Sequence, residues 1–303
     1  MLPTLRQLHY LKLLAEHRSF SRAAEAAHVT QPTLSAGVQE LERILGAPVV
    51  DRGRAGVILT AAGEEAVARA EAILAQAEDL VEAARGASQP LAGRFRLGVI
   101  PTIAPFLLPR ALPALRQRFP KLRLFLREDL TSRLIAGLKA GALDAALIAM
   151  PYDMTGLAWA DVAEDELLAA FPANHPLCAA HRIAPERLED EDLILLEDGH
   201  CLREHVMTVC GISPSRARDD TAFAATSLPT LVQMVGSGLG VSFLPAMAVE
   251  AGLADAAAVS VRPLASDCAT RQIVVAWRAG SSRAAEGRLL AEVLREAGAQ
   301  VPA

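Results

Sequence analysis

The stretch "EHRSFSRAAEAAHVTQPTLSAGVQELERILG", from Glu16 to Gly46, decides the fold of the first part of the chain. Ser19 can cap a short helix "FSRAAEAAHV", and Thr30 can cap a second helix "QPTLSAGVQELERILG", because their side-chain oxygens accept hydrogen bonds from first-turn N–H groups. Pro32 falls in the first turn of the second helix, where its missing N–H costs little. Two capped helices joined by a tight turn indicate a helix-turn-helix.

A further helix precedes this motif, because "LRQLHYLKLLAEHR" repeats leucine about once per helical turn. On the helix that Thr30 caps, one face is apolar and is expected to pack inward through Leu34, Val38, Leu41 and Leu45. The opposite face carries small and polar residues, which allow a helix to lie close to base edges and phosphates. The residues expected to contact DNA here are Gln31, Pro32, Thr33, Ser35 and Gln39.

Two β-prone runs follow in "VVDRGRAGVILT", around a turn of glycine and arginine. They predict a wing that brings Arg52 and Arg54 near the phosphate backbone. Residues 1–60 are therefore expected to form a winged helix-turn-helix that binds DNA. The alternative is a three-helix protein-interaction module with a hairpin.

Residues 60 to 85, "TAAGEEAVARAEAILAQAEDLVEAAR", form one predicted helix with Thr60 as its cap. Small and apolar residues alternate spacings of three and four in a narrow seam, at Val67, Ala70, Leu74, Ala77, Val81 and Ala84. Such a seam lets two helices approach closely and favours a homodimer with two heads. The alternative is a helix buried against its own chain. We expect residues 61–93 to be a dimerisation helix and a hinge, "GASQPLAGR".

After this hinge, short apolar runs such as "FRLGVI", "DAALIAM" and "QIVVAW" alternate with helical segments. The alternation predicts α/β structure with largely parallel sheets over residues 94–303. Its length suits two lobes facing each other across a cleft, as in periplasmic binding proteins. Lobe one is expected at about 94–165 and 269–303, and lobe two at about 166–268.

The composition is that of a globular protein, with 30 Lys and Arg against 35 Asp and Glu. The N-terminal segment lacks the uninterrupted apolar core of a signal peptide, and no run reaches the roughly twenty apolar residues that span a membrane. We therefore expect a cytoplasmic protein whose four cysteines are thiols, metal ligands or switches. Nucleophile-elbow and zinc-helix motifs are missing, so no enzyme activity, cofactor or metal is expected.

Two cysteines stand nine positions apart in "EDGHCLREHVMTVCG", which runs from Glu197 to Gly211 and reads as a helix. Their spacing fits no standard zinc pattern. His200 and His205 are also poor metal partners, since a helix directs side chains five residues apart about 140° from each other.

The segment from Glu16 to Gly46 strongly resembles the winged helix-turn-helix of LysR-type transcriptional regulators, and the resemblance continues over essentially the whole chain. Within that family, "GVIPTIAPFLLP", "LEDGHCLREHVMTVC" and "ATSLPTLVQMVGSGLGVSFLP" resemble the OxyR group of hydrogen-peroxide sensors. The resemblance implies a tetramer built from dimers, bound to promoter DNA. It also implies that Cys201 is oxidised by peroxide to a sulfenic acid and then pairs with Cys210 as the resolving thiol.

The same resemblance implies a peroxide site at Thr102, Thr131, His200 and Arg271, and partners such as RNA polymerase and a glutaredoxin or thioredoxin. Both threonines follow apolar runs, at expected strand-to-helix turns. Cys201 should have a lowered pKa, because a helix N-terminus and a nearby cation favour a thiolate. On an intact helix Cys201 and Cys210 would lie roughly 13 Å apart along the axis. A disulfide needs Cα atoms within about 7 Å, so its formation should unwind the helix and act as a switch.

Two alternative functions remain. One is a LysR-type regulator that binds a small anionic inducer between its lobes, with passive cysteines. The other is a thiol peroxidase with a DNA-binding head. Cys178 and Cys268 match no reactive pattern and are expected to be spectators.

Overall fold

The computed structural model describes residues 2–53, 56–84, 90–188, 191–209, 224–255, 257–265 and 269–299. The chain divides into two compact units, one built mainly from residues up to 88 and one mainly from residue 89 onward. Within the described residues, no helix is long and apolar enough to cross a membrane.

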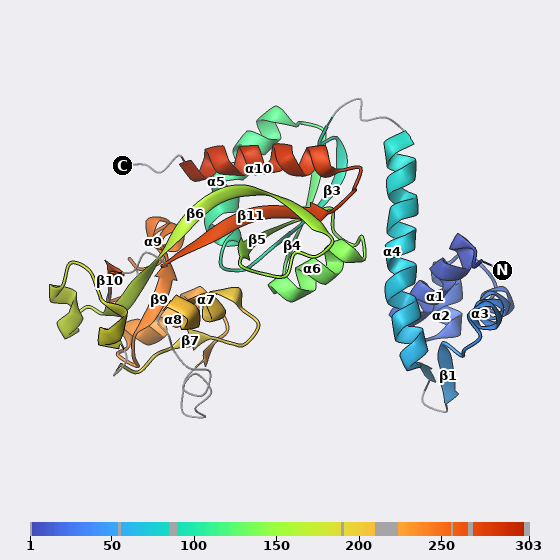
Figure 1. Cartoon of the computed structure of the whole chain (residues 1–303), viewed down its shortest axis with the longest axis horizontal. Coiled ribbons are helices and arrows are strands. Elements are labelled where there is room, and N and C mark those ends of the chain that lie inside the picture. The colour runs from blue at the N-terminus through green and yellow to red at the C-terminus, as the bar shows by residue number, and fades with distance from the viewer. Residues whose placement is uncertain are drawn as a thin grey trace. The chain divides into compact units, whose positions relative to one another are not determined.

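The first unit contains a head of three helices, a two-stranded wing and one long helix (Figure 1). The head helices are α1 (Leu5–His17), α2 (Phe20–Ala26) and α3 (Gln31–Leu45). As predicted, Ser19 caps α2 by accepting from the Arg22 N–H, and Thr30 caps α3 by accepting from the Thr33 N–H. The helix α2 ends at Ala26, earlier than predicted, because His28 takes a left-handed backbone conformation with φ of 55°.

The head core forms where α1, α2 and α3 meet. Leu34, Val38 and Leu41 of α3 are fully buried in it, as the apolar spacing predicts. The prediction for Leu45 is wrong, because this side chain is 44% exposed. Leu45 is the last residue of α3, and Gly46 ends the helix in a left-handed conformation, so the core no longer continues beneath it.

The wing is an antiparallel hairpin of β1 (Val50–Gly53) and β2 (Gly56–Leu59), as predicted. The long helix α4 (Ala61–Ala84) follows directly. Its predicted cap is confirmed, since the Thr60 hydroxyl accepts from the Gly63 N–H at 2.9 Å.

The first half of α4 packs on the head of its own chain rather than leaving its whole seam free. Ala70 is buried, and Val67 and Leu74 pack against the same core. Glu71, which lies outside the predicted seam, is also half-buried, and this burial raises the pKa of its carboxyl. The alternative of a helix buried against its own chain is therefore correct for this half of the seam.

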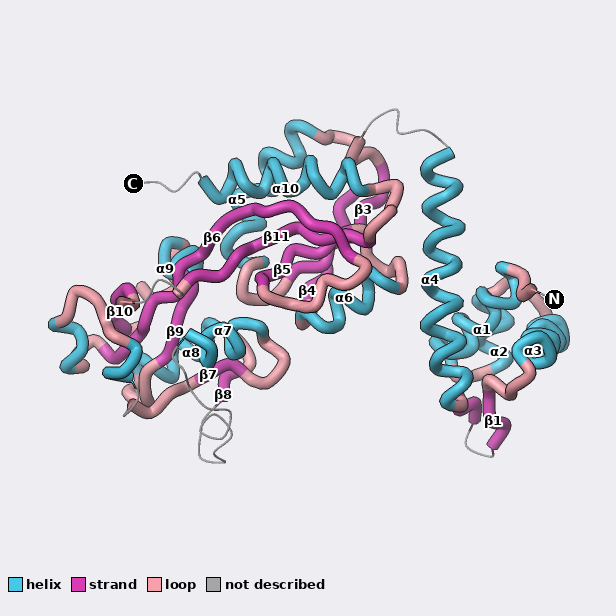
Figure 2. Tube along the Cα trace, in the orientation of Figure 1, coloured by secondary structure: helices cyan, strands magenta, loops and turns pink. Residues whose placement is uncertain are grey.

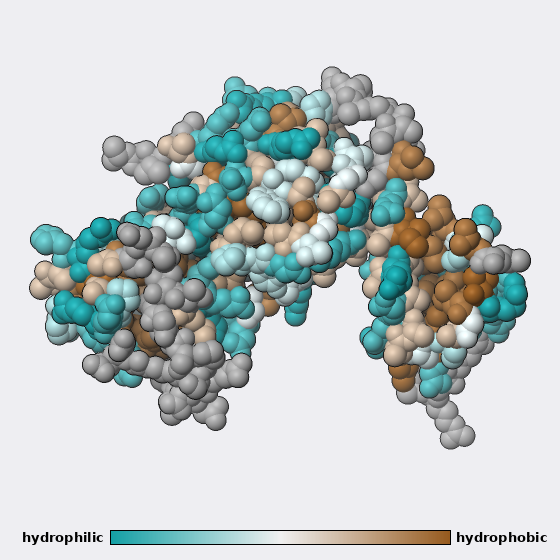
Figure 3. All heavy atoms as spheres, viewed as in Figure 1, coloured by the Kyte–Doolittle hydropathy of each residue, from teal (hydrophilic) through white to brown (hydrophobic). Residues whose placement is uncertain are grey.

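The exposed large apolar residues of α4 are Ile73, Leu80 and Val81, at 44%, 71% and 47% exposure. Apolar residues gather over the head and α4 on the face drawn in Figure 3. The stripe available to a partner helix therefore lies towards the C-terminal half of α4, and of the predicted seam it includes Val81.

The second unit is built around one seven-stranded sheet (Figure 2). Its strands are β3 (Gly93–Val99), β4 (Leu122–Glu128), β5 (Ala145–Met150), β6 (Leu157–Pro172), β9 (Ser242–Pro245), β10 (Val259–Pro263) and β11 (Thr270–Arg278). The strand order is β10-β6-β11-β5-β3-β4, and β9 also pairs with β6. A separate small sheet pairs β7 (Leu195–Leu196) with β8 (Ala224–Ala225).

The prediction of largely parallel sheets is wrong for the main sheet. Only β4, β3 and β5 are parallel neighbours in it, whereas β11, β6, β9 and β10 all join through antiparallel pairs. The reason is β6, which extends over 16 residues. It pairs with β11 along its first part and with β9 and β10 along its last part, so one strand serves both halves of the sheet.

Helices cover this sheet and connect its strands. They are α5 (Ala104–Arg118), α6 (Thr131–Lys139), α7 (Cys201–Val209), α8 (Leu228–Gly236), α9 (Ala246–Glu250) and α10 (Ala284–Ala299), with short 3-10 turns at Pro176–Ala179 and Pro185–Leu188. Helix α10 packs on α5, β6 and β11. Figure 1 shows α10 and α6 on opposite sides of the sheet.

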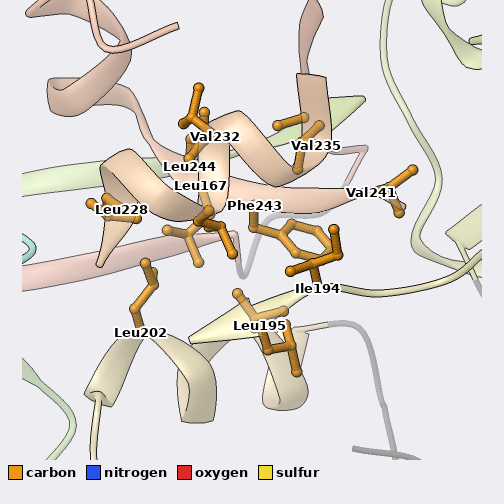
Figure 4. Close-up of a cluster of buried hydrophobic side chains, with 14 of the residues drawn as sticks. Leu167, Ile194, Leu195, Leu202, Leu228, Val232, Val235, Val241, Phe243 and Leu244 are labelled. Atoms are coloured by element: carbon orange, nitrogen blue, oxygen red, sulfur yellow. The ribbon is translucent and has the colours of Figure 1, made fainter. Parts of the chain in front are cut away.

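The end of the sheet formed by β9 and β10 has its own apolar core, to which α7 and α8 contribute. Figure 4 shows Leu202 of α7 directed into this core, together with side chains from β6, β9 and α8. The core therefore holds α7 in place through one side of the helix. The lobe boundaries proposed from the sequence stay a prediction.

Candidate redox-active site

The predicted site residues come from the ends of neighbouring strands. Thr102 follows β3, and Thr131 opens α6 after β4. Because β3 and β4 are parallel and adjacent, their carboxyl ends lie at the same edge of the sheet, where α/β proteins commonly bind ligands. Arg271 reaches this region from the start of β11.

Arg271 is a fully buried cation with defined partners. Its Nε donates to Asp165 Oδ2 at 2.9 Å, and its Nη2 lies 2.8 Å from the same oxygen. Its Nη1 donates to the Thr102 hydroxyl at 2.9 Å, and its Nη2 also donates to the Thr102 carbonyl at 3.0 Å. A buried charge must be paired in this way to avoid a large desolvation cost. The arrangement fixes the guanidinium and engages Thr102 directly.

Asp165 is a site residue that the sequence prediction missed. It lies on β6 directly opposite Arg271 in the strand register, and it is 4% exposed. Its Oδ1 accepts a hydrogen bond from the Met247 N–H, in the first turn of α9, at 3.0 Å. The signal was present in "AEDELLAAF", since period-two alternation puts Asp165 on the same buried face as Leu167.

Cys201 is the first residue of α7 and is 6% exposed. Burial raises the pKa of its thiol above the ordinary value, although the nearby Arg271 guanidinium opposes this rise. Glu204, on the same helix, raises it further. The prediction of a lowered pKa is therefore wrong for this structure, because removal of the sulfur from water outweighs the favourable charge.

Thr131 lies beside Cys201 and is 1% exposed. Its hydroxyl is close enough to the sulfur to favour the thiolate, yet it has no partner that satisfies hydrogen-bond geometry among the described residues. The hydroxyl is therefore unsatisfied, because a thiol is a weak partner and angle as well as distance decides such a bond.

The approach of α7 to α6 depends on a glycine. Gly199 has a φ of 95°, and a Cβ at this position would lie 2.9 Å from Leu130 Cδ1. Leu130 immediately precedes Thr131, so the turn that leads into Cys201 packs against the turn that leads into Thr131. Only glycine accepts both the left-handed backbone and this close contact.

The two histidines near Cys201 differ in their surroundings. His200 is half-buried directly before α7, and burial lowers the pKa of its imidazole. His205 lies one turn into α7 and is 8% exposed. Burial lowers the pKa of His205 as well, and the Arg271 charge adds to this effect. The sequence pattern suggests no role for His205 other than that of a poor metal ligand.

The structure brings together Cys201, Thr102, Thr131 and Arg271, and it places His200 next to Cys201 in the chain. Cys210 and Cys268 lie outside the described residues. Among the residues that are described, no cluster of histidine, cysteine and carboxylate side chains could hold a metal ion. A buried thiol beside a fixed cation and a free hydroxyl is chemically suited to react with a small polar oxidant.

The candidate DNA-binding face lies on α3. Gln31, Pro32, Thr33 and Gln39 are exposed, and Ser35 is half-buried. The Gln31 side chain accepts a hydrogen bond from the Ser21 hydroxyl of α2 at 3.0 Å, which orients it at the start of α3. The backbone of Arg52 lies in β1, and Arg54 falls outside the described residues.

Two family descriptions match this chain. Residues 5–64 match "Bacterial regulatory helix-turn-helix protein, lysR family", and residues 88–299 match "LysR substrate binding domain". Together they cover both units described above, and they agree with the predicted fold class.

Related proteins agree with the family descriptions. The HTH-type transcriptional regulator EstR of Acinetobacter baylyi is 43% identical over 251 residues, which cover 82% of this chain and 81% of that protein. The probable hydrogen peroxide-inducible genes activator of Streptomyces viridosporus is 38% identical over 300 residues, and the match covers 99% of this chain and 96% of that protein. This chain is also similar to the structure of a full-length OxyR variant from Pseudomonas aeruginosa in which one cysteine is changed to aspartate. The two structures superpose with a TM-score of 0.78 and share 36% sequence identity, and the match covers 97% of this chain and 98% of that chain.

Proposed function

Because this chain belongs to the LysR family of bacterial transcriptional regulators and is similar to OxyR-type peroxide-inducible activators, we propose that it switches transcription when hydrogen peroxide oxidises Cys201. The observation that carries the proposal is the buried Cys201 thiol beside the fixed Arg271 cation and the unsatisfied Thr131 hydroxyl. These three groups come from three separate elements of the fold.

Oxidation begins with attack of the Cys201 sulfur on one peroxide oxygen and gives a sulfenic acid. Arg271 stabilises the negative charge that develops on the leaving oxygen. Thr131 offers a hydroxyl to the bound peroxide, Thr102 holds the guanidinium, and His200 completes the site beside the sulfur. The sulfenic acid then condenses with the Cys210 thiol to a disulfide and releases water.

The disulfide is the event that changes the regulator. The α7 helix begins at Cys201 and extends to Val209, so the residue after it, Cys210, follows two and a half turns of helix. Closing the bond requires part of α7 to unwind, because the two Cα atoms must come within about 7 Å. Unwinding removes Leu202 from the apolar core that anchors the helix, and the change passes to the surrounding surface.

The regulator acts on promoter DNA through α3 and the wing, with Arg52 and Arg54 at the phosphates. It forms a dimer through α4 and a tetramer through its regulatory domains, and it acts in the cytoplasm with RNA polymerase and a thiol reductant as partners. Each subunit reacts once per cycle of oxidation and reduction, so the protein is a sensor and no enzyme. The proposed functional divisions are the DNA-binding head at residues 1–60, the dimerisation helix and hinge at residues 61–93, and the regulatory domain at residues 94–303.

The deciding experiment is intact mass measurement of the full chain after one equivalent of peroxide, with peptide mapping. We expect loss of two hydrogens and a peptide that links Cys201 to Cys210. The Cys201→Ser variant should keep its reduced-state DNA binding and lose the transcriptional response. If Cys201→Ser responds normally, the small-inducer alternative is correct; if the wild-type chain turns over many equivalents of peroxide with a thiol reductant, it is a peroxidase.

A further inference from the structure

Two buried side-chain atoms in the described residues have no hydrogen-bond partner, and both lie near Cys201 and Arg271. One is the Thr131 hydroxyl, which already belongs to the proposed site. The other is Nδ1 of His205. A buried polar atom without a partner destabilises a fold, so each such atom needs a physical explanation.

The buried face of α7 consists of two rows of side chains. Leu202 and Val206 form an apolar row inside the core of the second unit, as Figure 4 shows for Leu202. Cys201 and His205 form the other row and are both buried. Residues four positions apart are neighbours on a helix face, so His205 follows Cys201 by about one turn on the same side of α7. His205 Nδ1 and the Cys201 sulfur are not hydrogen-bonded to each other in this structure, since Nδ1 has no partner.

The orientation of the His205 ring follows from its other contact. The ring lies close enough to the backbone carbonyl of Met150, the last residue of β5, for that carbonyl to favour a proton on the ring and oppose the lowering of its pKa. A carbonyl only accepts, so the ring nitrogen at Met150 carries a proton, and it is Nε2 because Nδ1 has no partner. Burial and the Arg271 charge lower the pKa of His205, so the ring is neutral at neutral pH. Its Nδ1 therefore holds a free lone pair.

The Cys201 thiol, one helical turn before this lone pair, needs a proton acceptor. Burial raises the pKa of Cys201, so the sulfur is protonated at neutral pH in this structure. Only the thiolate attacks peroxide. The charged and titratable groups around the two side chains are Arg271 from β11, His200 directly before α7, Glu204 on α7 and Asp165 behind Arg271. Glu204 is exposed, His200 is only half-buried and Asp165 is bound to Arg271, which leaves His205 as the buried base.

We propose that His205 is the base that takes the proton from the Cys201 thiol and delivers it to the leaving oxygen of the peroxide. This inference rests on the proposed peroxide chemistry. His205 Nδ1 takes the S–H proton while the sulfur electron pair forms the S–O bond to the near oxygen. The O–O bond breaks, its electron pair stays on the far oxygen, and that oxygen takes the proton from His205 and leaves as water. Sulfur loses two electrons, peroxide gains them, and His205 returns to its neutral form.

The test is the rate of sulfenic acid formation at Cys201 in the full chain with Cys210→Ser, measured by a sulfenic-acid trap over a range of pH. His205→Phe keeps a ring of similar size but has no base. We expect a rate about 100-fold lower at neutral pH, typical for loss of a general base. The deficit should narrow as pH rises, because hydroxide then deprotonates the thiol directly.

Two further variants separate proton transfer from a structural effect. His205→Asn can accept a hydrogen bond but cannot take up a proton. Its rate of sulfenic acid formation should therefore be as low as that of His205→Phe at neutral pH and should rise as steeply with pH. This variant also tests the inference if His205→Phe does not fold. His181→Phe changes an exposed histidine and should react at the wild-type rate.

Three outcomes would overturn the inference. The first is a His205→Phe or His205→Asn rate equal to that of the parent. The second is a deficit that stays constant with pH, which would indicate a structural role for His205. The third is an unreactive parent protein, which would also overturn the proposed function; the first two outcomes leave that function intact.

Discussion

At the scale of single residues, Asp165 and Arg271 form the polar centre of the regulatory unit. Asp165→Asn removes the carboxylate that neutralises the buried guanidinium. We expect the free energy of unfolding to fall by about 3 kcal/mol, because an unpaired buried charge remains. Chemical denaturation measures this. Glu296→Gln, which breaks the exposed Arg118–Glu296 pair, is the control and should cost less than about 1 kcal/mol. Equal losses in the two variants would contradict the assigned role of Asp165.

The raised pKa of Cys201 makes a second prediction at this scale. The pKa of this thiol is higher in the folded than in the unfolded chain, so at high pH the unfolded chain loses the thiol proton first. The free energy of unfolding is therefore unaffected at low pH and falls once the pH exceeds the pKa of the thiol in the unfolded chain. The wild-type protein should therefore lose stability relative to Cys201→Ser above about pH 8.5 and not below it. Thermal unfolding of both proteins across this range measures the difference. A Cys201 thiolate already present at neutral pH, seen as a difference in ultraviolet absorbance, would contradict it.

At the scale of elements, the turn before α7 is held by a glycine that a side chain cannot replace. In Gly199→Ala the added Cβ meets Leu130 Cδ1 at 2.9 Å in addition to straining the backbone. We expect a loss of about 2 kcal/mol of stability and slower oxidation of Cys201, because the turn must move away from Thr131. Gly156→Ala has a similar backbone strain, with a φ of 79° and no atom near the added Cβ, and should leave oxidation unchanged. Equal oxidation rates would show that this contact does not position Cys201.

The helix α4 allows a second prediction at the element scale, because its two apolar regions have different partners. Leu80→Glu changes an exposed residue, so it should weaken the dimer and leave the head folded. Ala70→Glu places a charge in the head core and should destabilise the head itself. Analytical ultracentrifugation and thermal unfolding separate the two effects. A Leu80→Glu protein that stays dimeric at low concentration would contradict dimerisation through this part of α4.

At the scale of the whole molecule, the proposed DNA contacts and the proposed peroxide site lie in separate units of the chain. Gln39→Ala removes an exposed side chain of α3 and should lower specific promoter affinity by about 1 to 3 kcal/mol while leaving Cys201 oxidation unchanged. Arg52→Ala should weaken binding to all sequences and reduce the salt dependence of affinity by about one counterion. Titrations of the reduced protein at several salt concentrations measure both. An Arg52→Ala protein with unchanged affinity and salt slope would contradict the wing as a phosphate contact.

Local patterns in the sequence were enough to predict the head. The caps at Ser19 and Thr30, the buried face of α3 and the cap of α4 at Thr60 each depend on residues a few positions apart, so short-range physics determines them. The failure at Leu45 has the same origin, because periodicity describes a helix face but not where the core beneath it ends. The seam of α4 was likewise misassigned in its first half, since sequence alone does not say which partner covers an apolar stripe.

The resemblance to the OxyR group pointed to Cys201, Thr102, Thr131, His200 and Arg271 as candidate site residues. Tertiary structure was needed for three further features: the pairing of Asp165 with Arg271, the antiparallel half of the sheet, and the burial of His205 near Arg271. Asp165 and Arg271 are about a hundred residues apart in the chain and meet because β6 and β11 pair in register. The pKa of Cys201 depends on how many atoms surround the sulfur, and burial of that kind is a property of the packed fold. The sequence by itself therefore determined the residue types and the local elements, whereas the tertiary structure decided their partners, because those partners come from strands and helices distant along the chain.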